Sequence, residues 1–543
     1  MTLDWRRWTI AALALTLLSA SLTFGNIWPT PAIRWAWQLS VEWAALLMLL
    51  ATLGPRAARG SGWLRALSVL WIALVIGHYA DVTAPALYGR EVNLYWDLQH
   101  VAGVAAMLAK AAPVWGVVLV ALAVCIVLGI LYTGTHWALG RTAELARHRS
   151  GRAMLGAVGA ATAVLFAVQP VQTSIDGYDM ARPLFAAPVS STFFHQIRLV
   201  LESRTAASRL LAESPPMDSD LSRVKDTDVL LFFIESYGAV TYDRTEFATG
   251  LSASRSALEA AARDTGRSVV SAFAESPTFG GNSWLAHISL LSGVEVKDPD
   301  TNARIMAQRR DTLVTAFSRR GYRTVAIMPG MWQDWPEGAF YGFDDIYGGY
   351  RLDYRGPEFG WWAIPDQFAL AKLDAVELAR RDRRPVFAFF PFITSHAPFS
   401  PIAPYQPDWQ RLLGDGPYDQ SALDAAFADE PDWTNLGPSY VRSLAYDFTS
   451  IAGYLRTRAD RDFVMIVLGD HQPLAAVSGE GARWDVPVHV FTSRHDIVDR
   501  LLARGFTRGI DPTRPRIGRM HTLVTTFLDA LGDRPSTTVA TRQ

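Results

Sequence analysis

Residues 464–473, VMIVLGDHQP, join a strand-like run to two side chains of metal-binding type. The apolar residues 464–469 predict a strand that is buried on both faces. Asp470 and His471 follow directly, and Pro473 prevents a regular continuation of the strand. Aspartate and histidine are also common in turns, so this stretch alone leaves a structural and a chemical interpretation open. The rest of the chain favours the chemical one.

The amino-terminal third of the chain is strongly apolar. Half of the 543 residues are hydrophobic, and three long stretches have no charged residue: 8–33, 111–140 and 153–175. Each exceeds the ~20 residues that a membrane-spanning helix needs. Two weaker apolar spans, 35–54 and 62–80, bring the prediction to five membrane helices within residues 1–175. The first span would also suit a cleaved signal peptide, but four further spans favour an uncleaved anchor.

Arginine placement predicts the orientation of these helices. Most arginines of this region fall in alternate loops: Arg6, Arg7, Arg56, Arg59, Arg65, Arg141, Arg147, Arg149 and Arg152. By the positive-inside rule the amino terminus is cytoplasmic, and an odd number of spans puts everything after residue 172 outside the cytoplasm. The one cysteine, Cys125, excludes an intrachain disulfide. A net charge of −1 without a basic run gives no sign of nucleic-acid binding.

The second half of the chain alternates strand-like and helical patterns. A polar, Pro- and Ser-containing linker near the membrane is predicted for residues 176–226. The predicted strands are 229–235, 268–273, 322–328, 386–391, 463–469 and 486–492. Helical patterns between them include 252–263, 309–320, 367–380 and 439–456. This alternation predicts an α/β domain at 227–543, with a mostly parallel sheet covered by helices on both faces. In such domains, sites lie beyond the carboxyl ends of the strands.

Three predicted strands end in side chains that can bind a metal ion. Glu235 follows VLLFFI, His396 follows FAFFPFITS, and Asp470 with His471 ends the strand quoted above. The segment TFGGNSWLAHISLLSG, residues 278–293, adds Ser283 at a predicted helix start. These carboxylates, the imidazole of His471 and the serine oxygen form a mixed set that suits one divalent ion. Manganese is the first choice and zinc the alternative.

Ser283 has three candidate roles. It is a helix cap, a nucleophile activated by the metal, or a nucleophile paired with His287 one helical turn later. The metal-activated nucleophile is favoured, because the neighbouring ligand types already account for activation. His396 would then lie on the substrate side, as a proton donor to a leaving group or as a contact to its oxygens.

The ordered set of motifs resembles the alkaline phosphatase/sulfatase superfamily, and in particular the lipoteichoic acid synthases and related phosphoglycerol transferases. The resemblance spans the whole chain and implies an exported domain of alkaline phosphatase/sulfatase-like fold. It also implies that Ser283 is the nucleophile and His396 a substrate contact, with the metal ligands being Glu235, Ser283, Asp470 and His471. MWQDWPEGAFYGFDDIY, residues 331–347, resembles the family segment with a substrate-facing tryptophan, here Trp332; the alternative for Trp332 is core packing. YVRSLAYDFTSIAGYL, residues 440–455, resembles the helix before the last metal strand.

Several departures from that family narrow the interpretation. The synthases use threonine where this chain has Ser283, and Asp334 stands where they have arginine, which leaves the donor headgroup open. Sulfatases that mature a formylglycine need Pro and Arg two and four residues after the nucleophile, where this chain has Leu285 and His287. Phosphoethanolamine transferases carry disulfides, which a single cysteine cannot form.

The resemblance implies a metal-dependent enzyme of the bacterial cytoplasmic (inner) membrane, with its catalytic domain on the periplasmic side. It would move a phospholipid headgroup, phosphoglycerol or similar, to an envelope glycan or lipid through a phospho-serine intermediate. One alternative is a phosphodiesterase or sulfatase-type hydrolase with the same site. Another, of a different class, is a non-catalytic envelope scaffold, against which the retained ligand set argues.

Overall fold

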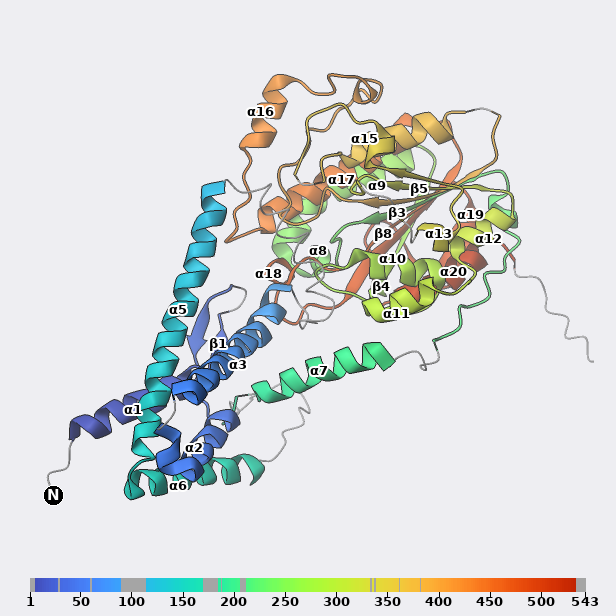
Figure 1. Cartoon of the computed structure of the whole chain (residues 1–543). Helices are drawn as coiled ribbons and strands as arrows, with labels where there is room; N and C mark the ends of the chain where they lie inside the picture. Colours follow the sequence, from blue (N-terminus) through green and yellow to red (C-terminus); the bar gives the residue numbers. More distant parts are fainter. Residues whose placement is uncertain are drawn as a thin grey trace, which may run out of the picture. The chain divides into compact units, whose positions relative to one another are not determined.

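A computed structural model describes residues 5–27, 30–58, 61–88, 114–168, 184–186, 188–205, 211–332, 335, 338–360, 362–380 and 382–533. The chain divides into two compact units, residues 1–208 and 209–543 (Figure 1). The division falls within the predicted linker at 176–226. The domain boundaries at 175 and 226 stay predictions.

The first unit is helical. Its main helices are α1 (Trp5–Ala20), α2 (Val41–Leu53), α3 (Ser61–Tyr88), α5 (Val114–Leu145), α6 (Arg149–Val168) and α7 (Val189–Thr205), with a small hairpin of β1 (Phe24–Asn26) and β2 (Ile33–Trp35). α1 and α3 pack on α5, and α2 packs on α6. Among the described residues, three helices are long and apolar enough to cross a membrane: α3, α5 and α6. α1 and α2 have only 16 and 13 residues, so five spanning helices stay a prediction.

The second unit is an α/β domain around one eight-stranded sheet with the order β10-β4-β9-β8-β3-β7-β5-β6. Its strands are β3 (Asp228–Ile234), β4 (Ser268–Glu275), β5 (Arg323–Met328), β6 (Asp345–Gly348), β7 (Val386–Phe392), β8 (Phe463–Gly469), β9 (Asp485–Thr492) and β10 (Thr507–Arg508). The central strands β8, β3, β7, β5 and β6 are parallel, while β9 runs antiparallel to β8 and β4. The predicted mostly parallel sheet is therefore confirmed.

Helices cover both faces of this sheet (Figure 1). One face packs against α10 (Ser283–Ser292), α11 (Pro299–Met306), α12 (Leu313–Arg319), α19 (His495–Leu502) and α20 (Leu523–Leu531). The other packs against α9 (Thr245–Asp264), α15 (Asp366–Leu373) and α17 (Gly437–Thr457). Short helices fill the connections: α8 (Val240–Asp243), α13 (Gly338–Tyr341), α14 (Gly349–Leu352), α16 (Gln420–Ala428) and α18 (Ala475–Ser478). Both faces are buried, which explains why the strands read as continuous apolar runs.

The helix predicted from residue 252 begins earlier, at Thr245, and two further predicted helices differ from the structure at their ends. The helix predicted from residue 309 begins at Leu313, because Thr312 caps it and accepts a hydrogen bond from the Thr315 amide at 3.1 Å. The helix predicted at 367–380 is α-helical only to Leu373 and continues as one π-helical turn, Asp374–Leu378. None of these differences moves a candidate site residue.

Candidate metal and nucleophile site

The register of the central strands brings the candidate ligands together. Ile234 at the end of β3 pairs with Gly469 at the end of β8, so the next residues, Glu235 and Asp470, leave the sheet side by side. A Cβ atom on Gly469 would lie 1.8 Å from the Tyr237 carbonyl oxygen, so only glycine allows this close approach of the two chain segments. The glycine before Asp470 is therefore part of how the site is built.

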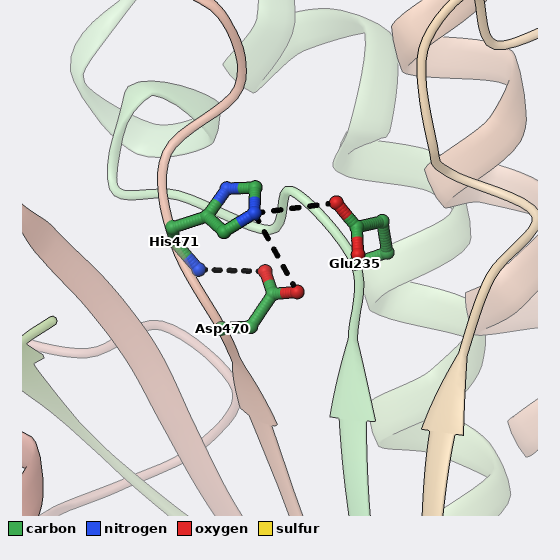
Figure 2. A group of neighbouring side chains, drawn as sticks. All are labelled: Glu235, Asp470 and His471. Carbon is green, nitrogen blue, oxygen red and sulfur yellow. Dashed lines mark hydrogen bonds and ion pairs between the residues drawn. The ribbon is translucent and has the colours of Figure 1, made fainter. Parts of the chain in front are cut away.

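Glu235, Asp470 and His471 form one buried cluster, in which each residue offers a ligand atom within 4.8 Å of the others. Figure 2 shows the three side chains pointing toward one another beyond the ends of β3 and β8. His471 Nε2 lies 3.3 Å from Glu235 Oε1 and 3.8 Å from Asp470 Oδ2. His471 Nδ1 lies 2.7 Å from the Gln472 carbonyl oxygen, to which it donates, and this fixes Nε2 as the atom that faces the carboxylates.

Ser283 completes the cluster from a different element. It is the first residue of α10, after Gly280, Gly281 and Asn282, all three of which have positive φ. Its hydroxyl donates to Glu235 Oε2 at 2.7 Å and lies 3.2 Å from His471 Nε2. The side chain is half-buried, and the amides of a first helical turn attract anions. Ser283 therefore adjoins the cluster, at a position that a negatively charged group would favour.

The cluster carries more negative charge than its one imidazole can balance. Burial raises the pKa of Asp470 well above its usual value, and the charge of Glu235 adds to this. Burial also disfavours an ionised Glu235, but the charge of His471 outweighs it and holds the Glu235 pKa below its ordinary range. For His471, burial is outweighed by Asp470 and Glu235, which raise its pKa to about 9. A divalent cation would displace the protons that otherwise compensate this charge.

The donor atoms fit a small four-coordinate ion. Ligands bound at about 2.0–2.2 Å in a tetrahedron lie roughly 3.3–3.6 Å apart. Here His471 Nε2 is 3.2 Å from Ser283 Oγ, 3.3 Å from Glu235 Oε1 and 3.8 Å from Asp470 Oδ2. The second oxygen of Asp470 is already engaged, since it accepts from the amides of Ser236 and His471 at 2.8 Å and 2.6 Å. The spacing and the donor types both suit such an ion.

His396 lies in the turn after β7, whose last residue Phe392 pairs with Ile234. Its Nδ1 donates to the Ala397 carbonyl oxygen at 2.8 Å, and the ring, whose centroid is 6.4 Å from that of Trp362, is half-buried. Its charge favours the ionised form of Glu235, which puts it within electrostatic reach of the cluster. The three strand ends that the sequence singled out are thus neighbours in the sheet.

Trp332 is partly buried and packs against the hydrophobic core on the face of the sheet that α9, α15 and α17 cover. Its ring meets that of Tyr350 edge to face, with 5.2 Å between centroids. These contacts fit the core-packing alternative for Trp332. A contact between Trp332 and the substrate stays a prediction. Asp334, the departure from the synthase pattern, lies outside the described residues.

His287 is embedded in aromatic side chains. Its ring centroid lies 4.6 Å from that of Phe233 and 5.4 Å from that of Phe389. Within the described part of the chain, its shielded Nε2 has no hydrogen-bond partner. Burial lowers its pKa to about 3. Both observations argue against a Ser283–His287 nucleophile–base pair.

The depressed pKa of His287 predicts acid sensitivity. Between its ordinary value of 6.5 and about 3, the unfolded chain binds a proton that the folded chain does not, so stability falls as pH falls through this window. We expect His287→Leu to reduce the loss between pH 7 and pH 4.5 by on the order of 2 kcal/mol. Urea unfolding at both pH values measures it, with the exposed His495→Leu as control. An unchanged pH dependence would contradict the burial argument.

Two residues that support the cluster were not predicted. Ser236, with a φ of 58°, donates its amide to Asp470 and its hydroxyl to Glu235 Oε1 at 3.1 Å. Gln472 orients His471 through its carbonyl, and its side-chain amide nitrogen donates to the Arg483 carbonyl at 2.7 Å. Their positions next to Glu235 and His471 were the available signal, because residues adjacent to ligands commonly orient them.

Residues 289–487 match the sulfatase family model. The matched residues lie within the α/β unit. The matched segment includes His396, Asp470 and His471, whereas Glu235 and Ser283 precede it, so their assignment rests on the geometry above. No curated protein matches the chain.

Three solved structures are similar to the chain. They are lipooligosaccharide phosphoethanolamine transferase A (EptA) from Neisseria meningitidis (13% identity, 96% of this chain and 95% of that chain, TM-score 0.44), lipoteichoic acid synthase LtaP from Listeria monocytogenes (11%, 62% and 78%, 0.38), and phosphoglycerol transferase GacH from Streptococcus pyogenes, in complex with sn-glycerol-1-phosphate (12%, 63% and 85%, 0.34). At these scores the similarity decides neither the fold nor the function.

Proposed function

We propose that this chain is a membrane-anchored, metal-dependent transferase that moves a phospholipid headgroup to an envelope glycan or lipid through a phospho-serine intermediate. The observation that carries the proposal is the contact of the Ser283 hydroxyl with Glu235 and His471, at 2.7 Å and 3.2 Å. The match to the sulfatase family model and the apolar helices α3, α5 and α6 support it, since a lipid donor lies in a membrane. Phosphoglycerol is the first candidate headgroup.

The residues of the site suit the two steps of such a transfer. Ser283 Oγ would release its proton to solvent and attack phosphorus, while the bond from phosphorus to the glyceride oxygen breaks and diacylglycerol leaves. His396 would give the leaving oxygen its proton. An acceptor hydroxyl would then attack the phospho-serine and give its proton to His396, while the bond from phosphorus to Ser283 Oγ breaks and the serine regains a proton from solvent. A divalent ion held by Glu235, Ser283, Asp470 and His471 would favour the deprotonated serine and neutralise charge on the phosphoryl group, with manganese or zinc as candidates.

Lipid mass spectrometry tests the reaction. Cells with the gene should accumulate diacylglycerol and a headgroup-modified acceptor, and cells without it, or with Ser283→Ala, should not. Release of the free headgroup phosphate without a modified acceptor would indicate the hydrolase alternative. Equal lipids in all three strains, together with rescue of an envelope defect by Ser283→Ala, would indicate the scaffold.

Reporter fusions test the topology. We propose five spanning helices with a cytoplasmic amino terminus and the α/β unit on the periplasmic side of the cytoplasmic membrane. An alkaline phosphatase reporter, active only outside the cytoplasm, should be active when fused after residue 180 and inactive when fused near Leu145. The reverse pattern would overturn the orientation and the access to envelope substrates.

A further inference from the structure

A buried pair of carboxyl groups, Asp366 and Asp447, lies behind the turn that carries His396. Asp366 is the first residue of α15 and Asp447 lies in the middle of α17; both side chains have no exposure to solvent. The two helices are in contact, and the charge of Asp366 acts on Asp447. Neither residue belongs to the metal cluster.

Asp366 holds the turn after β7. Its carboxylate accepts from the Ile393 amide at 2.9 Å and 3.0 Å, and from the Thr394 amide at 2.6 Å. The same turn is closed by the His396 amide, which donates to the Ile393 carbonyl at 3.0 Å. Ser395, which directly precedes His396 in this turn, donates its hydroxyl to the Glu235 carbonyl oxygen at 2.7 Å. The Asp366 carboxylate therefore fixes the backbone that presents His396. The Ser395 hydroxyl connects the same turn to Glu235, a candidate metal ligand.

Asp447 is in the opposite situation. Within the described part of the chain, neither of its carboxyl oxygens accepts a hydrogen bond of good geometry. The nearby Ser395 hydroxyl favours the ionised form of Asp447, but it donates to the Glu235 carbonyl oxygen instead.

Glu235 acts on Asp366, Asp366 acts on Asp447, and both carboxyls act on the neighbouring Tyr446; none of these groups supplies a positive charge. An ionised carboxylate in such surroundings is strongly disfavoured, and two adjacent ones more so. Burial and the charge of Asp366 accordingly raise the pKa of Asp447 well above its usual value. Burial also raises the pKa of Asp366, but only to about 6, because hydrogen bonds from Thr394 and Ile393 oppose the rise.

We propose that Asp366 and Asp447 are a positioning pair for His396, in which Asp366 is ionised and fixes the 393–396 turn while Asp447 is protonated. With Asp447 neutral, the negative charge of the pair lies on Asp366, which directs it at the amides of Ile393 and Thr394. The role given to His396 rests on the proposed function. The asymmetry between the two carboxyls does not, and it can be tested without any substrate.

The test compares carboxyl-to-amide variants of the full-length chain in detergent. An amide resembles a protonated carboxyl group, so Asp447→Asn should leave the unfolding temperature unchanged or raise it. Asp366→Asn removes a charged acceptor of backbone hydrogen bonds and should lower the unfolding temperature by roughly 5 °C. Asp374→Asn is the matched control, because Asp374 is a buried carboxylate paired with Arg458 elsewhere between the same helical segments.

Modification of His396 by diethyl pyrocarbonate, quantified on the peptide by mass spectrometry, reports its position. Asp366→Asn should change the rate at least about threefold, whereas Asp447→Asn and Asp374→Asn should not, although Asp374→Asn also lowers stability. If Asp447→Asn lowered the unfolding temperature as much as Asp366→Asn, Asp447 would be ionised beside another counter-charge, such as a bound cation. This result would overturn the proposal. An unchanged His396 rate in Asp366→Asn would also overturn it, by reducing the pair to a structural role. A chain inactive on phospholipids with the expected pattern would refute the proposed function alone.

Discussion

Ser283→Ala should abolish turnover of a glycerophospholipid donor, by roughly 10³-fold or more, while the fold remains intact. The reason is the position of the hydroxyl, 2.7 Å from Glu235 and 3.2 Å from His471 at the start of α10. Asn282 occupies the cap position and Ser283 is the first helical residue, so loss of its hydroxyl should cost no more than the ~1 kcal/mol typical of a cap. Thermal unfolding alongside the kinetic assay separates the two effects.

Two companion variants distinguish the candidate roles of Ser283. Ser283→Thr should keep measurable turnover, because it preserves a hydroxyl at the same place. His287→Ala should reduce turnover much less than Ser283→Ala, since its ring is packed between Phe233 and Phe389. A complete loss in His287→Ala with a normal unfolding temperature would instead favour a serine–histidine pair.

Asp470→Ala should release the divalent ion, with a fall in metal affinity of roughly 10²-fold or more. The Asp470 carboxylate supplies one candidate ligand oxygen, and its other oxygen accepts from the amides of Ser236 and His471. The substitution therefore removes one ligand and also removes a hydrogen bond that holds the backbone of His471. Elemental analysis of the purified full-length chain should find about one ion per chain in the wild type and far less in the variant. Asp374→Ala, a buried carboxylate outside the cluster, should keep the ion.

The positions of Glu235, Asp470 and His471 at strand ends were predictable because the pattern that indicates them is local in the sequence. Apolar runs that end in Glu235 and in Asp470 with His471 mark strands and their carboxyl ends, and parallel pairing then brings those ends together. The helix start at Ser283 followed equally from its glycine and asparagine neighbours. β6 and β10 were missed because four and two residues are too few to give a period.

Other features depend on tertiary contacts that no local pattern contains. The hydrogen-bond partners of Asp366 are backbone amides 27 and 28 residues away in the sequence. An aspartate within a helix, such as Asp447, is expected on the solvent-exposed face of that helix, and only the structure shows that it is buried. The ring environment of His287 also comes from two different strands, β3 and β7. The third predicted span, 62–80, lies in α3, which is long and apolar enough to cross a membrane, whereas the first two lie at α1 and α2, which have only 16 and 13 residues.

The covalent intermediate tests the central claim most directly. The full-length protein is exposed briefly to a glycerophospholipid donor, quenched in acid, and analysed by peptide mass spectrometry. The wild type should carry the mass of the phospho-headgroup on the peptide that contains Ser283, and neither Ser283→Ala nor chelator-treated protein should carry it. An adduct on another residue, or one that persists in Ser283→Ala, would contradict Ser283 as the nucleophile.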